Sequence, residues 1–354
     1  MIPLPCTPMQ TNTESLPSVS IVITVRNEAR HIGDCLTRIL ASTYPAARLE
    51  VLVADGGSVD GTKEVVRRIM ADNPIVRLIE DVGGSREHGL NTCIRAARGE
   101  IVARIDARTR IPPDYIATCV DTLLSTGADN VGGWVRPVAT SKLGTAVGYV
   151  MASAFAIDRS RFRSKPTGYV HTVYLGCFKK DVFDRVGLFD EREAVISEDS
   201  DLNMRILSSG GRVYRTSDIV SDFCVRDTLY EFWRLYFRYG AASAGFFLKH
   251  ARHLKVHELM TARFWRQFLT PLLVLLATAV LATPPAFGLK PILVVSALGC
   301  GLSAALSTLS VRKRTDLAVL AAASLLFPCM YVSHGVGYLL RICQGSYAKR
   351  YWCR

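Results

Sequence analysis

The sequence predicts an α/β protein with a mostly parallel sheet, followed by C-terminal transmembrane helices. Four short apolar runs between residues 18 and 105 alternate with stretches in which apolar residues recur at helical spacing. Parallel strands need helical crossovers, so this alternation predicts a Rossmann-like sheet. Beyond residue 266 three long apolar stretches follow, and their lengths favour helices that span a membrane.

Each predicted strand is a short apolar run that ends in polar residues. We expect strands at 18–25, 49–54, 75–79, 101–105 and 130–135. Amphipathic helices follow the first three strands. A further apolar helix is expected at 143–157, either in the core or on a surface that faces a membrane.

Two aspartates lie directly after predicted strands. Asp55 follows the strand at 49–54, and Asp106 follows the strand at 101–105. Ligands of open α/β sheets bind outside the carboxyl ends of the strands, so both carboxylates are candidate site residues. For Asp106, a turn ahead of Pro112-Pro113 is an equally good interpretation.

A glycine-rich turn connects Asp55 to the next helix. Its sequence, Asp-Gly-Gly-Ser-Val-Asp-Gly-Thr up to Thr62, lets the backbone approach a ligand closely, and the following helix N-terminus favours phosphate. The turn matches neither the dinucleotide-binding fingerprint nor the phosphate loop of NTPases, which disfavours both of those enzyme classes. The alternative is a glycine-rich turn that binds nothing.

A cluster of carboxylates opens a predicted helix near residue 200. Glu198, Asp199 and Asp201 lie within four residues, and Leu202 and Ile206 supply the apolar side of the helix. Mutual repulsion raises the pKa of at least one such carboxyl, which suits a general base that works near neutral pH. The alternative is an acidic N-terminus that interacts with the helix dipole, and without further context that interpretation is simpler.

The charge of the chain indicates an anionic partner. Lys and Arg total 43 against 31 Asp and Glu, a net charge of +12. Residues 226–266 hold eight basic and three acidic residues directly before the first long apolar stretch, which favours a membrane surface over nucleic acid. The ten cysteines form no Cys-x-x-Cys pair, and reduced cysteines suit a cytoplasmic domain. Residues 1–16 lack the apolar core of a signal peptide.

Four motifs together resemble the family 2 glycosyltransferases, which have the GT-A fold. They occur in the order and spacing of that family, and the resemblance covers residues 18–245. The motifs are Val19 to Glu28, Asp55 to Thr62, Gly99 to Asp106, and Glu198 to Arg205. Segments that resemble the succinoglycan-type exopolysaccharide glucosyltransferases of this family are Arg104-Ile-Asp-Ala ahead of Pro-Pro-Asp-Tyr, Gly187-Leu-Phe-Asp, and Arg234 to Gly240.

The resemblance implies a role for each matching residue on the donor side. Asp55 would contact the base of a nucleotide-sugar, and Thr24, Arg26 and Asn27 would line the same pocket. Asp106 would hold a divalent cation, Mg²⁺ or Mn²⁺, that bridges the diphosphate.

The resemblance places the catalytic roles on the acidic motif. Asp199 would deprotonate the acceptor hydroxyl with support from Glu198, and Arg205 would contact substrate. Family members invert the anomeric centre by direct displacement. The metal offsets charge on the leaving diphosphate, while the base activates the incoming oxygen from the opposite face.

One position departs from the family pattern. Relatives carry Asp-x-Asp at this strand end, whereas here Arg108 stands at the third position. Either Asp106 and water suffice for the cation, or Arg108 itself binds the substrate and neutralises phosphate charge. The Gln-x-x-Arg-Trp signature of processive synthases is also absent from the sequence, which favours addition of a single sugar.

These observations lead to the hypothesis of a membrane-anchored, inverting hexosyltransferase. It would move a sugar from a nucleotide donor, most simply a UDP-sugar, to a polyprenyl-linked or saccharide acceptor in surface polysaccharide synthesis. Membrane lipids are expected partners, and nucleic acid is not. The rival hypothesis is a non-catalytic scaffold that binds nucleotide-sugar, which Arg108 favours. A membrane-bound dehydrogenase is disfavoured by the missing dinucleotide fingerprint.

The expected organisation has five parts. They are a disordered segment at 1–17, the GT-A domain at 18–225, a basic membrane-interface segment at 226–266, two or three transmembrane helices within 267–341, and a basic tail at 342–354. Arg312 to Arg314 would lie in a cytoplasmic loop, so we expect a multi-pass inner-membrane protein with a cytoplasmic catalytic domain. Pro328, Gly335 and Gly337 leave open whether the third apolar stretch crosses or re-enters the membrane.

Overall fold

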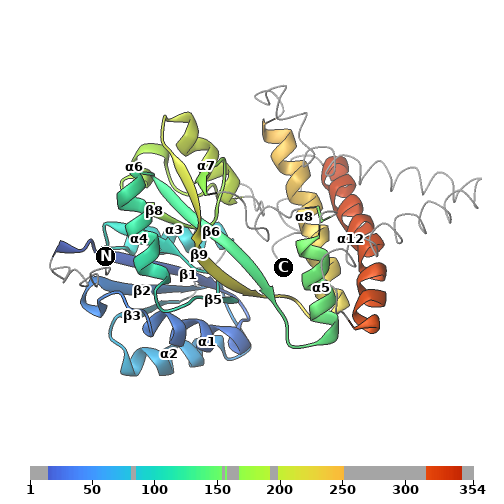
Figure 1. Ribbon diagram of the computed structural model, residues 1–354, viewed down its shortest axis with the longest axis horizontal. Coiled ribbons are helices and arrows are strands. Elements are labelled where there is room, and N and C mark those ends of the chain that lie inside the picture. The colour runs from blue at the N-terminus through green and yellow to red at the C-terminus, as the bar shows by residue number, and fades with distance from the viewer. Residues whose placement is uncertain are drawn as a thin grey trace, which may run out of the picture.

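A single mixed β-sheet organises the molecule (Figure 1). The computed structural model describes residues 15–80, 85–153, 156–157, 167–191, 198–250 and 316–344. The strand order is β3-β2-β1-β4-β8-β6-β9-β5, and β7 pairs with β9. This confirms the predicted α/β class and the GT-A-like sheet.

The first half of the sheet is the parallel arrangement that the sequence predicts. Its strands are β1 (Val19–Val25), β2 (Leu49–Asp55), β3 (Val76–Ile79) and β4 (Ile101–Arg104). Its helices are α1 (Ala29–Leu40), α2 (Thr62–Asp72) and α3 (Arg86–Ala96), and a short 3₁₀ turn covers Ala46–Arg48. Because β1 pairs in parallel with both β2 and β4, the residues after β2 and β4 lie at one edge of the sheet.

The second half of the sheet mixes strand directions. β8 (Tyr174–Lys179) runs antiparallel between β4 and β6 (Asn130–Val138), whereas β6 and β9 (Val213–Cys224) are parallel. Two-residue strands at the margin are β5 (Thr109–Arg110) and β7 (Gly168–Tyr169), and the helices here are α4 (Tyr115–Thr126), α6 (Val182–Val186) and α7 (Glu198–Ser208). The antiparallel β8 is what places α7 beside the end of β4.

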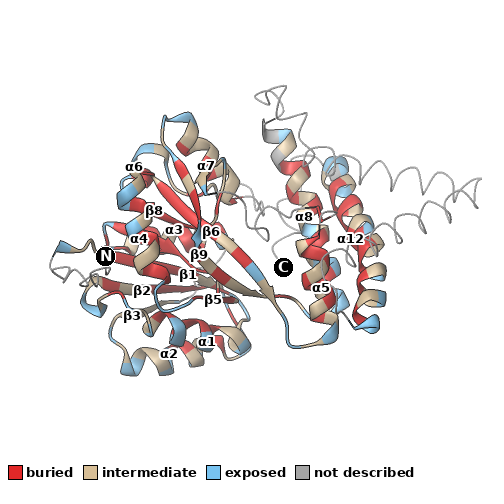
Figure 2. Cartoon of the chain, in the orientation of Figure 1, coloured by how far each residue is buried: buried red, intermediate tan, exposed pale blue. Residues whose placement is uncertain are grey.

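Two hydrophobic cores lie on the two faces of the sheet, as the period of two along a strand requires (Figure 2). Ile101 and Ala103 of β4 pack in the core that contains α1, α2 and α4. Val102 packs in the core that contains α3, α6 and α7. Arg104 has the same parity as Val102, so the backbone directs it toward α3 and α7.

A separate helix bundle packs beside the sheet domain (Figure 1). It consists of α5 (Lys142–Ala152), α8 (Leu229–His250) and α12 (Leu317–Gln344). The backbones of α8 and α12 meet closely: a Cβ on Gly240 would lie 1.9 Å from the carbonyl oxygen of His334, and one on Gly337 would lie 2.0 Å from that of Phe237. Only glycine fits at these two crossing points, and this is how membrane helices often pack.

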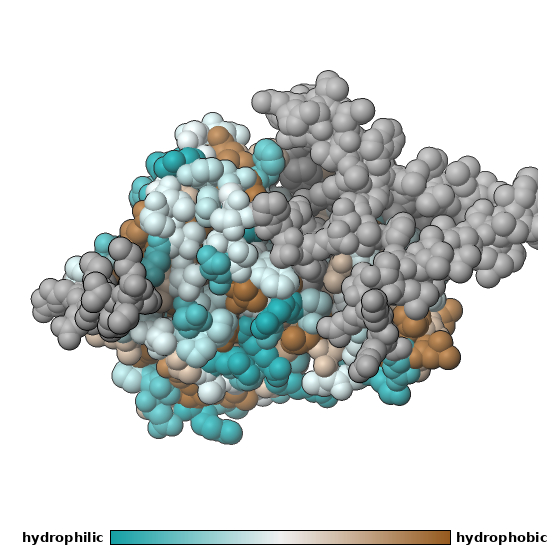
Figure 3. Space-filling view, in the orientation of Figure 1, coloured by the Kyte–Doolittle hydropathy of each residue, from teal (hydrophilic) through white to brown (hydrophobic). Residues whose placement is uncertain are grey.

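Among the described residues, α12 is the only helix long and apolar enough to cross a membrane, with a mean hydropathy of 1.7 over its best window. It continues through Pro328 without a break. Apolar side chains such as Leu317 and Leu325 are exposed on it, whereas the surface of the sheet domain is more polar (Figure 3). The other two apolar stretches, 268–282 and 292–309, lie outside the described residues, as does most of the basic loop at 159–168.

Candidate active site

Asp55 ends β2 in a turn that leaves one of its oxygens available. Its Oδ1 accepts hydrogen bonds from the backbone N–H of Gly57 at 3.0 Å and of Ser58 at 2.8 Å. Gly57 has a φ of +81°, a conformation that glycine adopts at low cost. Asp55 Oδ2 is buried and has no hydrogen-bond partner among the described residues. A buried acceptor without a partner is costly, so this oxygen is suited to a ligand's N–H group.

The turn after β1 is tied to the glycine-rich turn after β2. The backbone N–H of Asn27 donates to Ser58 Oγ at 2.8 Å, and Asn27 Oδ1 accepts from the N–H of Val59 at 2.9 Å. Asn27 adopts a φ of +56°, which Asn tolerates better than most residues. Arg26 is exposed beside it, and Thr24 packs against α3 near Gly89. The predicted donor-side residues are thus brought to one place.

Asp106, Glu198 and Asp199 form a second group, held together by the buried Arg104. Arg104 is only 1% exposed, and its Nη2 lies 3.2 Å from Asp106 Oδ1 and 2.9 Å from Glu198 Oε1. Its Nη1 donates to Asp199 Oδ1. The ring of Phe189 lies 5.9 Å from the guanidinium carbon. One side chain of β4 therefore fixes carboxylates that lie more than ninety positions apart in the chain.

Arg86 and Tyr174 complete the surroundings of Asp106. Nη2 of Arg86 lies 2.7 Å from both Asp106 oxygens, and its Nη1 lies 3.3 Å from Glu198 Oε1. The hydroxyl of Tyr174 donates to Asp106 Oδ2 at 3.0 Å. Each oxygen of Asp106 thus has two protein partners in the described structure.

The two neighbouring carboxyls at the start of α7 are shifted in opposite directions. Burial raises the pKa of Asp199 to about 6; the charge of Glu198 adds to the rise and that of Arg104 opposes it. Burial acts in the same way on Glu198, but Arg86 and Arg104 hold its pKa below the usual value. Glu198 contacts both arginines, which explains the difference. Environments that separate two carboxyls in this way are typical of acid–base sites.

Asp106 is held in its ionised form. Burial would raise its pKa, but Arg86 and Arg104 keep that pKa well below its usual range. Among the described residues, no group of three or more His, Cys, Asp and Glu side chains could hold a metal ion. A cation at Asp106 would therefore need further oxygen ligands from outside the protein, such as those of a diphosphate.

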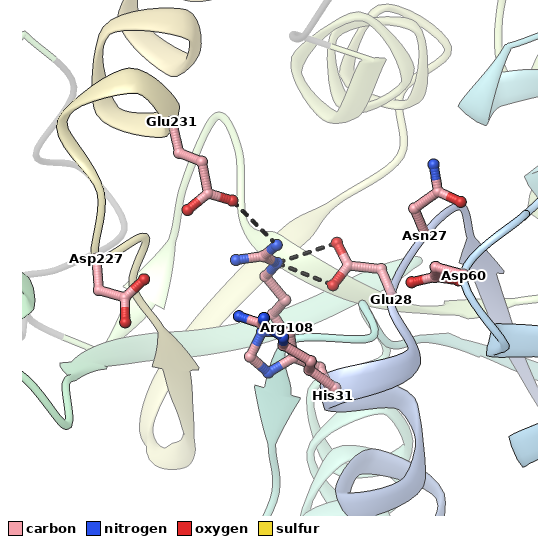
Figure 4. Close-up of a pocket in the computed structure, with 8 residues that line it drawn as sticks. Asn27, Glu28, His31, Asp60, Arg108, Asp227 and Glu231 are labelled. Atoms are coloured by element: carbon pink, nitrogen blue, oxygen red, sulfur yellow. Dashed lines mark hydrogen bonds and ion pairs between the residues drawn. The ribbon is translucent and has the colours of Figure 1, made fainter.

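Arg108 lies in a polar pocket of about 230 Å³ between the sheet domain and α8 (Figure 4). Its Nε lies 3.0 Å from both oxygens of Glu28, and its Nη2 lies 3.5 Å from Glu231. The pocket is lined by Asn27, Glu28, Arg30, His31, Asp60, Arg108, Asp227 and Glu231. Arg108 thus links α1 to α8 through carboxylates, which its sequence position alone does not predict.

Arg205 lies on α7 but turns toward the backbone after α6. Its guanidinium donates to the carbonyls of Val186 at 2.5 Å, Gly187 at 3.1 Å and Leu188 at 2.9 Å. Its Nε lies 3.1 Å from Asp201. These contacts make Arg205 a brace that fixes the helix carrying Glu198 and Asp199, whereas contact with substrate stays a prediction.

Sequence reasoning missed three residues of this site. Arg104 could have been predicted, because a cation within an apolar strand must find a buried partner. No sequence pattern indicates Arg86 or Tyr174. The fold brings them to Asp106, Arg86 from the start of α3 and Tyr174 from the antiparallel strand β8.

The fold and the two carboxylate groups at one sheet edge define a glycosyltransferase of the GT-A class. Residues 20–183 match the family described as Glycosyl transferase family 2. The chain is 30% identical over 243 residues to the succinoglycan biosynthesis protein ExoA of Rhizobium meliloti, which covers 68% of this chain and 72% of the relative. The chain therefore belongs to glycosyltransferase family 2.

A second relative agrees with this assignment, and a solved structure agrees with the fold. The chain is 40% identical over 125 residues to glycosyltransferase AglE of Haloferax volcanii, covering 35% of this chain and 41% of the relative. The structure of mannosyltransferase PcManGT from Pyrobaculum calidifontis, in complex with GDP-Man and Mn²⁺, matches with a TM-score of 0.59 at 24% identity. That match covers 92% of this chain and 88% of the mannosyltransferase.

Proposed function

We propose that the protein transfers a hexosyl group from a nucleotide-sugar, most simply a UDP-sugar, to a polyprenyl-linked or saccharide acceptor, with inversion at the anomeric carbon. The observation that carries this proposal is the assembly of Asp106, Glu198 and Asp199 around Arg104 at the edge of the sheet. The process served is surface polysaccharide synthesis, as the match to a succinoglycan biosynthesis protein suggests.

The nucleotide binds at the glycine-rich turn in this proposal. The unpartnered Oδ2 of Asp55 accepts an N–H of the base, and Thr24, Arg26 and Asn27 line the same pocket. The diphosphate then extends toward Asp106, which lies at the same sheet edge. Arg108 contributes positive charge on that path once phosphate competes with Glu28 and Glu231.

Asp199 acts as the general base. Its raised pKa lets it accept a proton from an acceptor hydroxyl and still be ionised at neutral pH. Glu198 stays charged and, with Arg104, holds Asp199 in place. The new bond forms between the acceptor oxygen and the anomeric carbon as the bond to the diphosphate breaks. The proton from the hydroxyl moves to Asp199.

Asp106 is the protein ligand for Mg²⁺ or Mn²⁺ in this proposal. When bound, the cation offsets the charge that develops on the leaving diphosphate. Asp106 supplies one hard oxygen ligand, and Tyr174 orients that carboxylate through its hydrogen bond. Arg205 keeps the carbonyls of residues 186–188 close to α7.

The protein is membrane-anchored in this proposal, with the catalytic domain on the cytoplasmic side of the inner membrane. Support comes from the length and hydropathy of α12 and from the basic segment at 226–266, of which α8 forms the described part. Membrane lipids are then partners of the bundle, and the lipid-linked acceptor reaches the site from the bilayer surface.

A donor-panel assay tests the activity. The purified full chain in detergent is incubated with UDP-, GDP- and dTDP-sugars and a polyprenyl-phosphate acceptor, and nucleoside diphosphate release and product are measured. We expect release from one nucleotide class that stops in Asp199→Asn and continues in Asp184→Asn, an exposed neighbour on α6. Tight nucleotide binding without any transfer would instead support the non-catalytic scaffold, which the substitution of Arg108 for the family's second carboxylate favours.

A further inference from the structure

Two arginines contact Asp106, and their surroundings differ greatly. Arg104 is 1% exposed, bonded to all three carboxylates and packed against Phe189. Arg86 stands at the first turn of α3, its side chain is 39% exposed, and within the described residues it forms ion pairs with Asp106 and Glu198. Moving Arg104 would leave three carboxylates short of a counter-charge, the buried Glu198 and the two half-buried aspartates. Moving Arg86 costs less, because its side chain is partly exposed and Arg104 remains bonded to both Asp106 and Glu198.

Arg86 occupies the place that a cation needs. Its Nη2 lies 2.7 Å from both oxygens of Asp106, the bridging position over the open side of that carboxylate. The remaining lone pairs accept from Arg104 and Tyr174, which are both parts of the sheet. A divalent ion can therefore approach Asp106 only if Arg86 leaves. Two cations at one carboxylate also repel each other strongly.

Arg86 has a second partner within reach. Its Nη1 already lies 3.3 Å from Glu198, so a rotation of the side chain can keep the charge paired after Asp106 is released. Glu198 stays ionised because the two arginines lower its pKa. The exchange thus needs no movement of the backbone.

We propose that Arg86 is an exchangeable counter-ion of Asp106, which excludes the divalent cation until a nucleotide diphosphate arrives and so imposes the order nucleotide first, cation second. This inference rests on the proposed function. A free cation that displaces Arg86 gains one carboxylate, whereas hard cations prefer several oxygen ligands. A diphosphate adds both oxygen ligands and negative charge, and these make the exchange favourable.

The test measures Mn²⁺ binding by the full chain in detergent, using the loss of the electron paramagnetic resonance signal of free Mn²⁺. Titrations are run with no nucleotide, with UDP and with GDP. We expect the native chain to bind Mn²⁺ weakly without nucleotide and far more tightly with one of the two. In Arg86→Met the nucleotide-free affinity rises by roughly ten- to a hundred-fold, because a competing unit charge is gone.

Matched variants make the result specific. Arg38→Met removes an arginine of similar exposure that pairs with Asp34 on α1 and not with Asp106, and it leaves Mn²⁺ binding unchanged. Arg86→Lys keeps the charge without the bridging geometry and gives an intermediate affinity. Thermal melting of each variant reports its folding, and a structural role for Arg86 would lower the affinity for Mn²⁺, not raise it.

The outcomes separate this inference from the proposed function. If Arg86→Met binds nucleotide-free Mn²⁺ no better than the native chain, the exchange is wrong, whatever the enzyme does. If no variant binds Mn²⁺ even with UDP or GDP while transfer proceeds, the metal role is wrong and with it the exchange. If Mn²⁺ binding follows the expected pattern but no donor supports transfer, the exchange stands and the catalytic proposal fails.

Discussion

Asp55 at the end of β2 and Asp106 after β4 lie at the same sheet edge on either side of β1, yet they are held in opposite ways. Asp55 is fixed by two backbone N–H groups of its own turn, and its second oxygen has no partner among the described residues. Asp106 is surrounded by side chains, with guanidinium groups from α3 and β4 and a hydroxyl from β8. The first carboxylate is prepared for a neutral hydrogen-bond donor, and the second for a charge that must be exchanged.

This contrast separates permanent from replaceable partners. A backbone N–H cannot leave without a change in the turn, so the Asp55 site is already in its binding geometry. The partly exposed side chain of Arg86 can rotate, so the proposed exchange would give the Asp106 site a second arrangement of the same residues. The variants below test whether the partners of Asp55 and Asp106 differ in this way, and they measure the effect on activity, stability or binding.

The largest effect is expected from Asp199→Asn, which removes the proposed general base. Transfer should fall by roughly 10²–10⁴-fold, the usual contribution of a general base. Nucleotide affinity should stay within about a few-fold, because the proposed nucleotide site is at Asp55. Steady-state transfer and nucleotide titration give the two numbers. Near-native turnover would show that the base lies elsewhere.

Next in size is the loss of stability in Arg104→Met. Removing one partner of a buried ionic cluster costs about 3–5 kcal/mol in the free energy of unfolding, because Asp106, Glu198 and Asp199 lose their shared counter-charge. Arg86→Met should cost less than Arg104→Met, because the Arg86 side chain is partly exposed and Arg104 still contacts Asp106 and Glu198. Urea denaturation of both variants measures the difference. Equal decreases in the free energy of unfolding would contradict the idea that Arg104 is fixed and Arg86 is exchangeable.

A smaller effect is expected from Asp55→Asn. The amide keeps one oxygen but presents an N–H or a neutral oxygen to the base, so nucleotide affinity should fall by roughly ten- to a hundred-fold, the range for a hydrogen bond to a charged group. Nucleotide-free Mn²⁺ binding should not change, because that depends on Asp106. A calorimetric titration with UDP and with GDP measures the loss of affinity. An unchanged affinity would show that the nucleobase binds at another part of the chain.

The smallest effect is the pH dependence of the native chain. A general base must be ionised, and burial raises the pKa of Asp199 to about 6. kcat/KM should therefore be level above that pH and fall by about tenfold per pH unit below it. Glu198 should not change the pH profile between about pH 5 and 8, because the two arginines lower its pKa and keep it ionised there. A profile that is flat down to pH 5 would exclude Asp199 as the base.

The sequence allowed the first half of the fold to be predicted because its signals are local. Apolar runs, helical spacing and the glycine-rich turn define β1 to β4 and the position of Asp55 within a few residues. The order of the remaining strands depends on contacts between distant segments. The antiparallel insertion of β8 between β4 and β6 therefore did not follow from periodicity.

The same distinction applies to the site. Asp106, Glu198 and Asp199 could be named because each lies in a recognisable motif, but their shared partner Arg104 was counted as part of an apolar strand. Arg108 was expected at phosphate, and the structure pairs it with Glu28 and Glu231, a contact that needs the start of α8 to lie near the N-terminal end of α1. Partners that come from other elements are invisible to spacing arguments.

The two glycine crossings between α8 and α12 have a consequence for how the enzyme meets its acceptor. Because Gly240 and Gly337 bring the two backbones into contact, side chains cannot act as compressible spacers between these helices. α8 begins only a few residues after β9 ends. The short connection limits how far α8, and α12 packed on it, can move relative to the sheet. If α12 lies in a membrane, as proposed above, the α8–α12 pair fixes the distance of Asp199 from that membrane and so limits which acceptor hydroxyls can reach it.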